Sequence, residues 1–194
     1  MANTSSITGL TPKRYRNGAP WTGALRRYYH PATDAVALFV GDPVIIAGSA
    51  DADGTPTATR ATAAGGARWT GAVVGFEPNA TINAVGYGAA STAFYVLVAD
   101  DPALLFEIQD DSVGGALAAT SVGLNADFIA AAGSTSTKMS GFMLDSSTAD
   151  VTATLQMRIV GLEQRGDNEI GATAKWLVAN NLPTETGAAG ALGV

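Results

Sequence analysis

Residues 93–111, with the sequence AFYVLVADDPALLFEIQDD, decide the fold class of this chain. Residues 94–99 are apolar on both alternating faces and rich in β-branched and aromatic side chains, which is typical of a strand covered on both sides. The Asp-Asp-Pro sequence at 100–102 interrupts this run, because aspartate favours turns and proline cannot donate to a strand ladder. Residues 104–109 alternate better, so we expect one face of this second strand to meet water or a neighbour. The pattern predicts a hairpin at the centre of a β-rich domain.

Further alternating runs predict the rest of one antiparallel β domain. The additional predicted strands are residues 35–40, 44–47, 55–62, 68–76, 83–88, 153–160 and 174–179. Gly71 and Gly75 indicate bulges or a close approach of the backbone, and one short helix is expected to begin at Asn125 as its N-cap. The predicted fold class is all-β: an antiparallel β-sandwich or barrel of roughly eight to ten short strands with an extended N-terminal arm.

The composition narrows the class of protein. Hydrophobic residues make up 47% of the 194 residues, enough for a core, and the 23 glycines favour short strands joined by turns. Charged residues are only 14%, below the roughly 25% of an average domain, so we expect other subunits to cover much of the surface. The absence of cysteine excludes disulfides and thiolate metal sites. No apolar run predicts a membrane span, and no signal peptide is recognised, so we expect synthesis in a reducing compartment.

The positive charge is concentrated in the first part of the chain. Residues 1–30 hold five basic residues and no acid, whereas the remainder holds 6 basic and 17 acidic residues. The segment has no helical or strand period, yet it contains four aromatic side chains, which a disordered tail rarely carries. We therefore predict three parts: an extended N-terminal arm (1–30), a β-rich body (31–181) and a flexible C-terminal tail (182–194).

Aromatic side chains interleaved with arginines are typical of a segment that becomes ordered on a protein partner. RNA binding would use the same residue types, but the acidic body argues against a nucleic-acid partner. A solvated basic tail beside an acidic domain is the other reading of this charge pattern. The residues predicted to bind a partner are Arg14, Tyr15, Arg16, Trp21, Arg26, Arg27, Tyr28 and Tyr29.

The sequence offers no catalytic constellation. His30 is the only histidine, so a pair of histidines cannot ligate a metal, and no G-x-S-x-G motif surrounds a serine. Phosphate-binding and dinucleotide-binding glycine patterns are absent as well. Residues 51–54 begin like a calcium loop but lack the later acid. We therefore expect no enzymatic activity, no cofactor and no metal centre, and we interpret His30 as an interface or turn residue.

Five acidic residues gather around the central strands. Two carboxylates that flank a bond can hydrolyse a glycoside, and such a group can also bind surface calcium. Four of the five stand in adjacent pairs at turns, where aspartate is favoured by local hydrogen bonding. We interpret the group as turn residues or as a docking site for the arm. Its members are Asp100, Asp101, Glu107, Asp110 and Asp111.

Several segments together resemble small decoration, or cement, proteins of tailed-bacteriophage heads. These segments are VGDPVIIAG (40–48), GAVVGFEPN (71–79), FYVLVADDPALLFEIQDD (94–111), VGLNADF (122–128) and DNEIGATAKWLVANN (167–181). The resemblance implies a β-rich, non-enzymatic protein that binds the major capsid protein on the exterior of the virion in many copies. It also implies a homo-oligomer, with a trimer favoured, and it gives the acidic group no role.

The leading hypothesis is therefore a structural protein of a virion that decorates and stabilises the phage head. The first alternative is a head-tail joining or tail-tube component, which would also be β-rich. An alternative of a different class is a calcium- or carbohydrate-binding β-sandwich module that uses the acidic loops. No nucleic-acid or membrane partner is expected.

Overall fold

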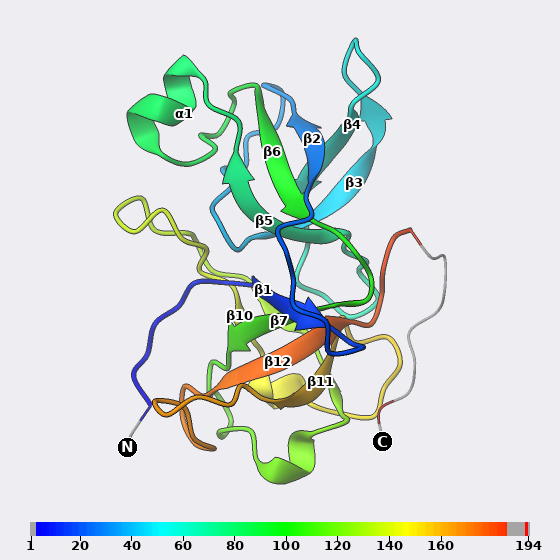
Figure 1. Ribbon diagram of the computed structural model, residues 1–194, viewed down its shortest axis with the longest axis vertical. Helices are drawn as coiled ribbons and strands as arrows, with labels where there is room; N and C mark the ends of the chain where they lie inside the picture. Colours follow the sequence, from blue (N-terminus) through cyan, green and yellow to red (C-terminus); the bar gives the residue numbers. More distant parts are fainter. Residues whose placement is uncertain (1–2, 186–192, 194) are drawn as a thin grey trace.

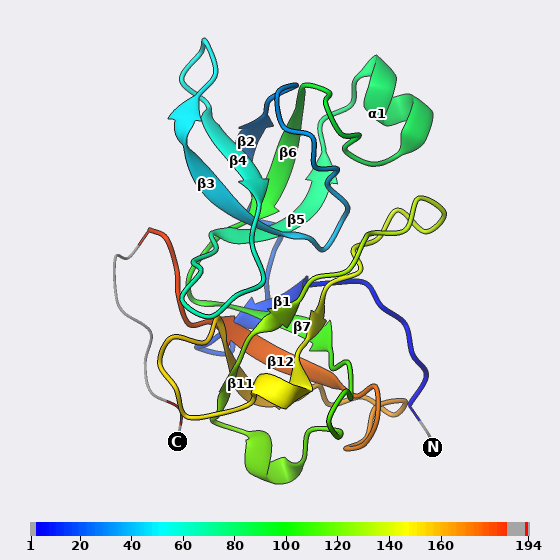
Figure 2. The ribbon, with the colours of Figure 1, turned by 180° about the vertical axis from the view of Figure 1, so that it is seen from behind.

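The structure is a computed structural model that describes residues 3–185 and residue 193. It is nearly all β, with 37% strand and 7% helix, which confirms the predicted fold class. Two parts are stacked along the long axis of the molecule: a small closed barrel, and a five-stranded sheet below it (Figure 1). The same stacking is clear from behind (Figure 2).

Five strands close the barrel in the order β2-β4-β3-β5-β6. They are β2 (Arg26–His30), β3 (Pro43–Ala50), β4 (Pro56–Arg60), β5 (Gly71–Phe76) and β6 (Phe94–Ala99). Neighbouring strands are antiparallel except β2 and β4, which are parallel. Side chains such as Tyr28, Val96 and Val98 fill the interior and are fully buried. Because the barrel is closed, these strands leave no unpaired edge.

The lower part is a sheet with strand order β1-β7-β12-β11-β8, in which all pairs are antiparallel. Its strands are β1 (Thr11–Tyr15), β7 (Leu104–Gln109), β8 (Asn125–Ala126), β11 (Met157–Leu162) and β12 (Lys175–Asn180). The ladder of β9 (Phe128–Ile129) and β10 (Met143–Leu144) and the 3₁₀ helices η1 (Ala119–Ser121) and η2 (Ser146–Thr148) complete this part.

The two faces of the lower sheet differ. The inner face carries Phe106, Ile159 and Trp176, which are buried in the main core together with Phe128 and Phe142 from the β9–β10 side. The outer face carries the alternate residues of the same strands.

The stretch 93–111 joins the two parts of the molecule. β6 pairs with β2 and β5 in the barrel, whereas β7 pairs with β1 and β12 in the sheet. The predicted hairpin is therefore wrong, because the turn after β6 carries the chain from one layer into the other instead of folding it back. One face of residues 104–109 was expected to meet water or a neighbour, and the structure shows the second, because all six residues of β7 are buried.

The predicted extended arm, residues 1–30, is folded into the body. β1 pairs with β7, and β2 is a barrel strand between β4 and β6. The boundary at residue 30 is therefore wrong, because β2 completes the closure of the barrel. Residues 11–15 and 26–30 form main-chain hydrogen bonds with neighbouring strands. Their strand pattern is not visible in the sequence, because the proline and glycine residues around them interrupt the alternation of apolar side chains.

Local capping explains a second difference. Residues 83–88 were expected to form a strand, but they belong to or follow the helix α1 (Ala80–Val85). The Asn79 side chain accepts a hydrogen bond from the Ile82 N–H, and Gly86 ends the helix in the left-handed conformation with φ of 74°. The N-cap and the C-cap of the helix therefore outweigh the weak alternation of apolar residues that predicted a strand.

Three further segments depart from the expectation. Asn125 begins the strand β8 instead of a helix, since its main chain pairs with Asp150. Residues 35–40 form isolated bridges only, such as the one between Leu38 and Gly88. The predicted flexible tail lies partly outside the described residues, but residues 182–185 pack on the body, where Leu182 is 5% exposed.

The two glycines expected to mark irregular backbone do so. The register of β5 against β6 shifts between Val73 and Gly75, which is a bulge. A Cβ added at Gly71 would lie 2.3 Å from the main-chain oxygen of Ala99. Both features confirm the predicted bulge and close backbone approach.

Gln156 joins the barrel to the sheet. Its Oε1 accepts from the N–H groups of Ala64 and Phe128, and its Nε2 donates to the carbonyls of Thr62 and Ala67. The residue is fully buried, and its main-chain oxygen accepts the indole N–H of Trp69 at 3.1 Å. The loop between β4 and β5 is thereby tied to the segment that enters β11.

Trp69 supports the same junction by packing. The side chain is fully buried, and its ring lies 5.5 Å from that of Phe106 and 5.2 Å from that of Phe128. Aromatic pairs at such distances add to the stabilisation that burial provides. The junction therefore combines a satisfied buried amide with a large aromatic contact.

Replacing Gln156 tests the contribution of the buried amide to stability. We expect Gln156→Leu to lower the free energy of unfolding by about 3 kcal/mol or more, because it leaves several buried main-chain groups without partners. Gln164→Leu is the matched control: Gln164 is exposed and donates only to the Leu162 carbonyl, so its effect should stay within about 0.5 kcal/mol. Urea unfolding measures both, and equal effects would contradict the assignment.

Candidate functional site

An apolar groove lies between the barrel and the sheet. It has a volume of about 200 Å³ and is lined by Thr8, Leu10, Thr11, Pro12, Trp21, Val40, Val73, Val74 and Met139. Its lining thus combines β1 and the segment that leads into it with the barrel strand β5. Trp21 is half-buried and donates its indole N–H to the Ala24 carbonyl at 3.3 Å. We call this feature the Trp21 groove.

The connection from the sheet to the barrel runs past this groove and is open to solvent. In residues 16–27 every residue except Trp21 is exposed. The segment includes Leu25, which is 39% exposed, and three arginines. An apolar groove beside an exposed strip that contains aromatic and arginine side chains has the composition of a protein-docking surface.

The predicted partner-binding residues lie on several different surfaces. Tyr28 is inside the barrel, where its hydroxyl donates to Asp100 at 2.7 Å, and burial raises its pKa. Tyr28 is therefore a core residue, and its predicted contact with a partner is wrong. Arg26 is exposed but paired with Asp100 at 3.1 Å and with Glu185.

Arg27 and Tyr29 lie on the outside of the barrel. The Arg27 guanidinium stacks on the Tyr95 ring at 3.6 Å and pairs with Glu77 at 3.1 Å. The rings of Tyr29 and Tyr95 are 5.5 Å apart. The Tyr95 hydroxyl donates to Asp51, and this hydrogen bond lowers the pKa of Asp51. The opening of the calcium-like loop is thus engaged within the protein.

The other predicted residues belong to the lower part. Tyr15 packs against the main core, and Arg14 and Arg16 lie at the end of β1. Trp21 alone among the eight lines the groove between the two parts. The sequence therefore did not predict how these side chains are divided between the core, the barrel surface, the groove and the sheet.

The five acidic residues of the central stretch are not brought together. Asp100 faces Arg26 and Tyr28, and Asp101 accepts from the Ala103 N–H within the turn. Asp110 and Asp111 accept from serine hydroxyls and main-chain N–H groups in the lower part, and burial raises the pKa of Asp110. These contacts agree with a role in turns and local structure.

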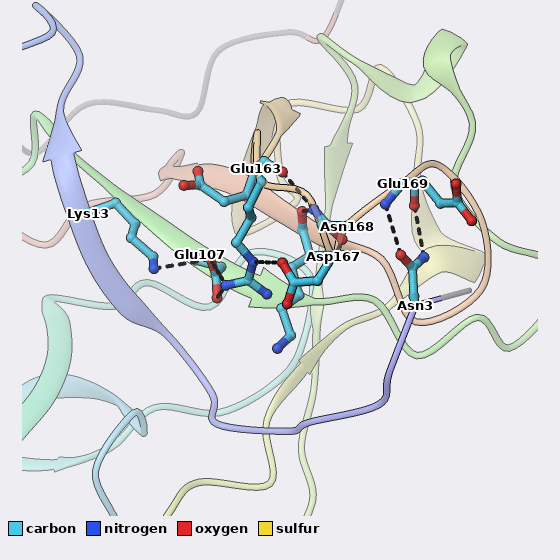
Figure 3. Close-up of polar contacts among 9 residues, drawn as sticks. Asn3, Lys13, Glu107, Glu163, Asp167, Asn168 and Glu169 are labelled. Carbon is cyan, nitrogen blue, oxygen red and sulfur yellow. Dashed lines mark hydrogen bonds and ion pairs between the residues drawn. The ribbon is translucent and has the colours of Figure 1, made fainter. Parts of the chain in front are cut away.

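Glu107 is the one acid of the group at the centre of a network of ion pairs. It lies on the outer face, where Lys13 Nζ is 3.1 Å away and Arg165 donates at 3.0 and 3.2 Å (Figure 3). Arg165 also pairs with Asp167 at 2.9 Å. The side chain of Glu107 is 7% exposed, so both cations compensate a buried charge.

Two asparagines hold the loop that supplies Arg165. Asn168 donates to the carbonyls of Glu163 and Lys175, and Asn3 makes three hydrogen bonds with Glu169 and Ala172 (Figure 3). The loop is therefore closed on itself and fastened to the N-terminal segment. This arrangement covers the outer face of the sheet, and both oxygens of Glu107 are already bonded to Arg165.

His30 is buried in the barrel, so its interpretation as an interface or turn residue is wrong. It is fully buried, its ring stacks on Phe94 at 4.6 Å, and its Nδ1 lies 3.2 Å from the Ala58 carbonyl. Within residues 3–185 and 193, no group of three or more His, Cys, Asp or Glu side chains is placed to hold a metal ion. In the same residues, no helix combines the length and the apolar character of a membrane span.

Comparison with known proteins gives no relative. No protein-family model, no curated protein and no solved structure matches the chain.

Replacing each of the two acidic partners of Arg165 in turn tests whether burial determines how much an ion pair stabilises the fold. We expect Glu107→Ala to lower the free energy of unfolding by about 2 kcal/mol, because it removes the hydrogen bonds that Arg165 donates to a buried carboxylate and the ion pair with Lys13. Asp167→Ala is the control, since the Asp167 side chain is 73% exposed and such a pair contributes under about 1 kcal/mol. Denaturant unfolding of both variants checks this, and a larger effect for Asp167 would contradict it.

Asp42 beside the groove is a second buried acid. It is fully buried, and its Oδ2 accepts from the Phe39 N–H at 2.9 Å. Burial raises its pKa from 3.8 to about 6, although Ser140, the Phe39 N–H and Arg60 act in the opposite direction. The folded protein therefore holds this proton more tightly than the unfolded chain. The stabilisation is fully present below about pH 3.8 and is lost as pH rises through about 6.

Asp42→Asn should remove this dependence. Between pH 4 and pH 7 we expect the wild type to lose stability relative to Asp42→Asn by on the order of 3 kcal/mol. The difference between the two proteins isolates Asp42, because Asp110 and Asp127 titrate in both. Urea unfolding at several pH values measures it, and parallel stability curves would contradict the raised pKa.

Proposed function

We propose that this chain is a structural protein of a virion, which decorates the exterior of a bacteriophage head by binding the major capsid protein. The Trp21 groove, with the exposed strip of residues 16–27 beside it, is the observation that carries the proposal. The segment resemblance to decoration proteins supplies the class of partner.

The mechanism is the burial of surface in many copies. Each copy that binds the assembled lattice but not free capsid subunits shifts the equilibrium toward the assembled form. Trp21 supplies the aromatic anchor, because tryptophan in a partly enclosed apolar site is among the residues that dominate interface energies. The exposed arginines of the strip steer and orient docking, since exposed ion pairs contribute little affinity.

The low charge content supports a covered surface. Only 14% of the residues are charged, and seven large apolar side chains in the described residues are exposed, from Leu25 at 39% to Val113 at 61%. A protein whose surface is largely covered by other proteins needs fewer charged residues for solubility.

Co-sedimentation with empty shells, assembled from the major capsid protein of the same phage, tests the proposal. The wild type should pellet with the shells, and Trp21→Ala should weaken attachment by about 2 kcal/mol or more, which is about thirtyfold. Val113→Ala is the control, because it removes an exposed apolar side chain that does not line the groove.

Both variants must first show wild-type circular dichroism, because Trp21 also contacts the main core. A wild-type chain that stays in the supernatant would overturn the proposed function. Attachment that is equal for Trp21→Ala and Val113→Ala would place the contact elsewhere on the molecule.

A further inference from the structure

Another concave site lies on the barrel, apart from the Trp21 groove. It has a volume of about 340 Å³, and its lining includes Tyr29, Glu77, Pro78, Asn79 and Tyr95. None of these residues lines the Trp21 groove, and none belongs to the five acidic residues of the central stretch. The volume is within the range of small-molecule sites, which is about 300–1,000 Å³. We call this site the tyrosine pocket.

The register of the barrel strands brings three of these side chains together. Tyr29 of β2 lies opposite Tyr95 of β6, and the N–H of Glu77, just after β5, donates to the Tyr95 carbonyl at 3.0 Å. Residues directly opposite one another in a sheet point to the same face. The alternate residues, such as Tyr28 and Val96, fill the barrel interior. The tyrosine pocket therefore lies on the outside of three adjacent strands, at the end of the barrel beside α1 (Figure 1).

Two half-buried tyrosine rings give the pocket an aromatic surface. The rings of Tyr29 and Tyr95 are tilted by 53° to each other. Tyr95 is held in place from two sides, because its hydroxyl donates to Asp51 at 2.7 Å and the Arg27 guanidinium stacks on its ring. The Tyr29 hydroxyl makes no hydrogen bond within residues 3–185. The pocket thus presents an ordered aromatic surface with one hydroxyl available to a ligand.

The polar groups of the pocket are each fixed by one bond and have capacity for another. Glu77 Oε1 pairs with Arg27 Nε at 3.1 Å, whereas Oε2 of the same carboxylate has no partner in the described part of the chain. Asn79 Oδ1 accepts from the Ile82 N–H at 2.8 Å, which orients the amide. The amide nitrogen of Asn79 makes no hydrogen bond to any described residue, so it retains two donors. A donor and an acceptor are therefore already positioned beside the tyrosine rings.

The charge and polarity of the lining narrow the class of ligand. Glu77 is the one charged residue of the lining, and Arg27 neutralises it, so the pocket does not select an anion or a cation. An apolar ligand would cover the polar groups of Glu77, Asn79 and Tyr29 without replacing their bonds to water, which costs free energy. A pyranose ring fits both parts of the lining. Its C–H faces pack on aromatic rings, and each of its hydroxyls can donate and accept.

We propose that the tyrosine pocket binds a neutral saccharide. A pyranose ring packs on Tyr29, and its hydroxyls accept from the Asn79 amide and donate to the free oxygen of Glu77. The inference goes beyond attachment to a capsid, which we assign to the Trp21 groove, and either one can hold without the other.

An NMR titration of the ¹⁵N-labelled full chain tests the proposal. The probes are neutral oligosaccharides built from glucose, galactose, mannose or N-acetylglucosamine units. At least one of them should shift the amide signals of Tyr29, Glu77 and Tyr95 in a saturable manner. Tyr29→Ala should weaken that binding by at least about tenfold, because it removes the ring on which the saccharide packs.

Two more variants separate the site from the fold. Asn79→Asp retains the oxygen that caps α1 but loses the amide donor, so binding should weaken by about threefold to tenfold, as for one lost hydrogen bond. Tyr87→Ala is the control, because Tyr87 is also a half-buried tyrosine, stacked on Phe39 at 4.8 Å, but does not line the pocket. Its binding should equal that of the wild type. Each variant must first show wild-type circular dichroism, and if Tyr29→Ala does not fold, Asn79→Asp decides.

Three results would overturn the inference. They are the absence of saturable shifts with every saccharide at millimolar concentration, shifts confined to residues away from the pocket, and folded pocket variants that bind as tightly as Tyr87→Ala. Saccharide binding by a chain that does not pellet with capsid shells would overturn only the proposed function. Attachment to shells without saccharide binding would overturn only this inference.

Discussion

The buried amide of Gln156 is the interaction on which the rest of the structure depends. One side chain satisfies two donors and two acceptors of the main chain, in the loop between β4 and β5 and at the start of β9. A buried polar group of this kind stabilises the fold only when every partner is present. It therefore fixes the orientation of the barrel on the sheet, and Trp69 fills the space beside it.

A second constraint explains why the first thirty residues belong to the body. The segment before β1 passes so close to the turn at the start of β3 that a Cβ at Gly41 would lie 2.0 Å from the Thr8 carbonyl oxygen. Gly9 and Gly41 both have positive φ, of 66° and 92°, which glycine adopts without strain. The Leu10 N–H donates to the Gly41 carbonyl. The chain thus enters the fold through a contact that only small residues allow.

The sequence predicted the parts of the structure that depend on local alternation, and missed those that depend on distant pairing. The strands of the central stretch and the buried faces of β11 and β12 follow from alternating apolar residues. The partners of β6 and β7 do not, because either a hairpin or a crossover between layers is compatible with an Asp-Pro turn. Similarly, the aromatic and basic composition of residues 26–30 suggested a partner, although Tyr28 fills the barrel of its own chain. The Trp21 groove could not be predicted, since it forms only where the two parts meet.

The central claim is that barrel, sheet and N-terminal segment form one cooperative unit, held at the junction of Gln156 and Trp69. Native-state hydrogen exchange tests it most directly, because it measures the free energy of opening for each amide. The account predicts that the slowest amides of β2, β6, β7 and β12 exchange with a common free energy equal to that of global unfolding. Exchange of β2 at the rate of an unstructured chain, or opening of the whole barrel at a lower free energy than the sheet, would contradict it.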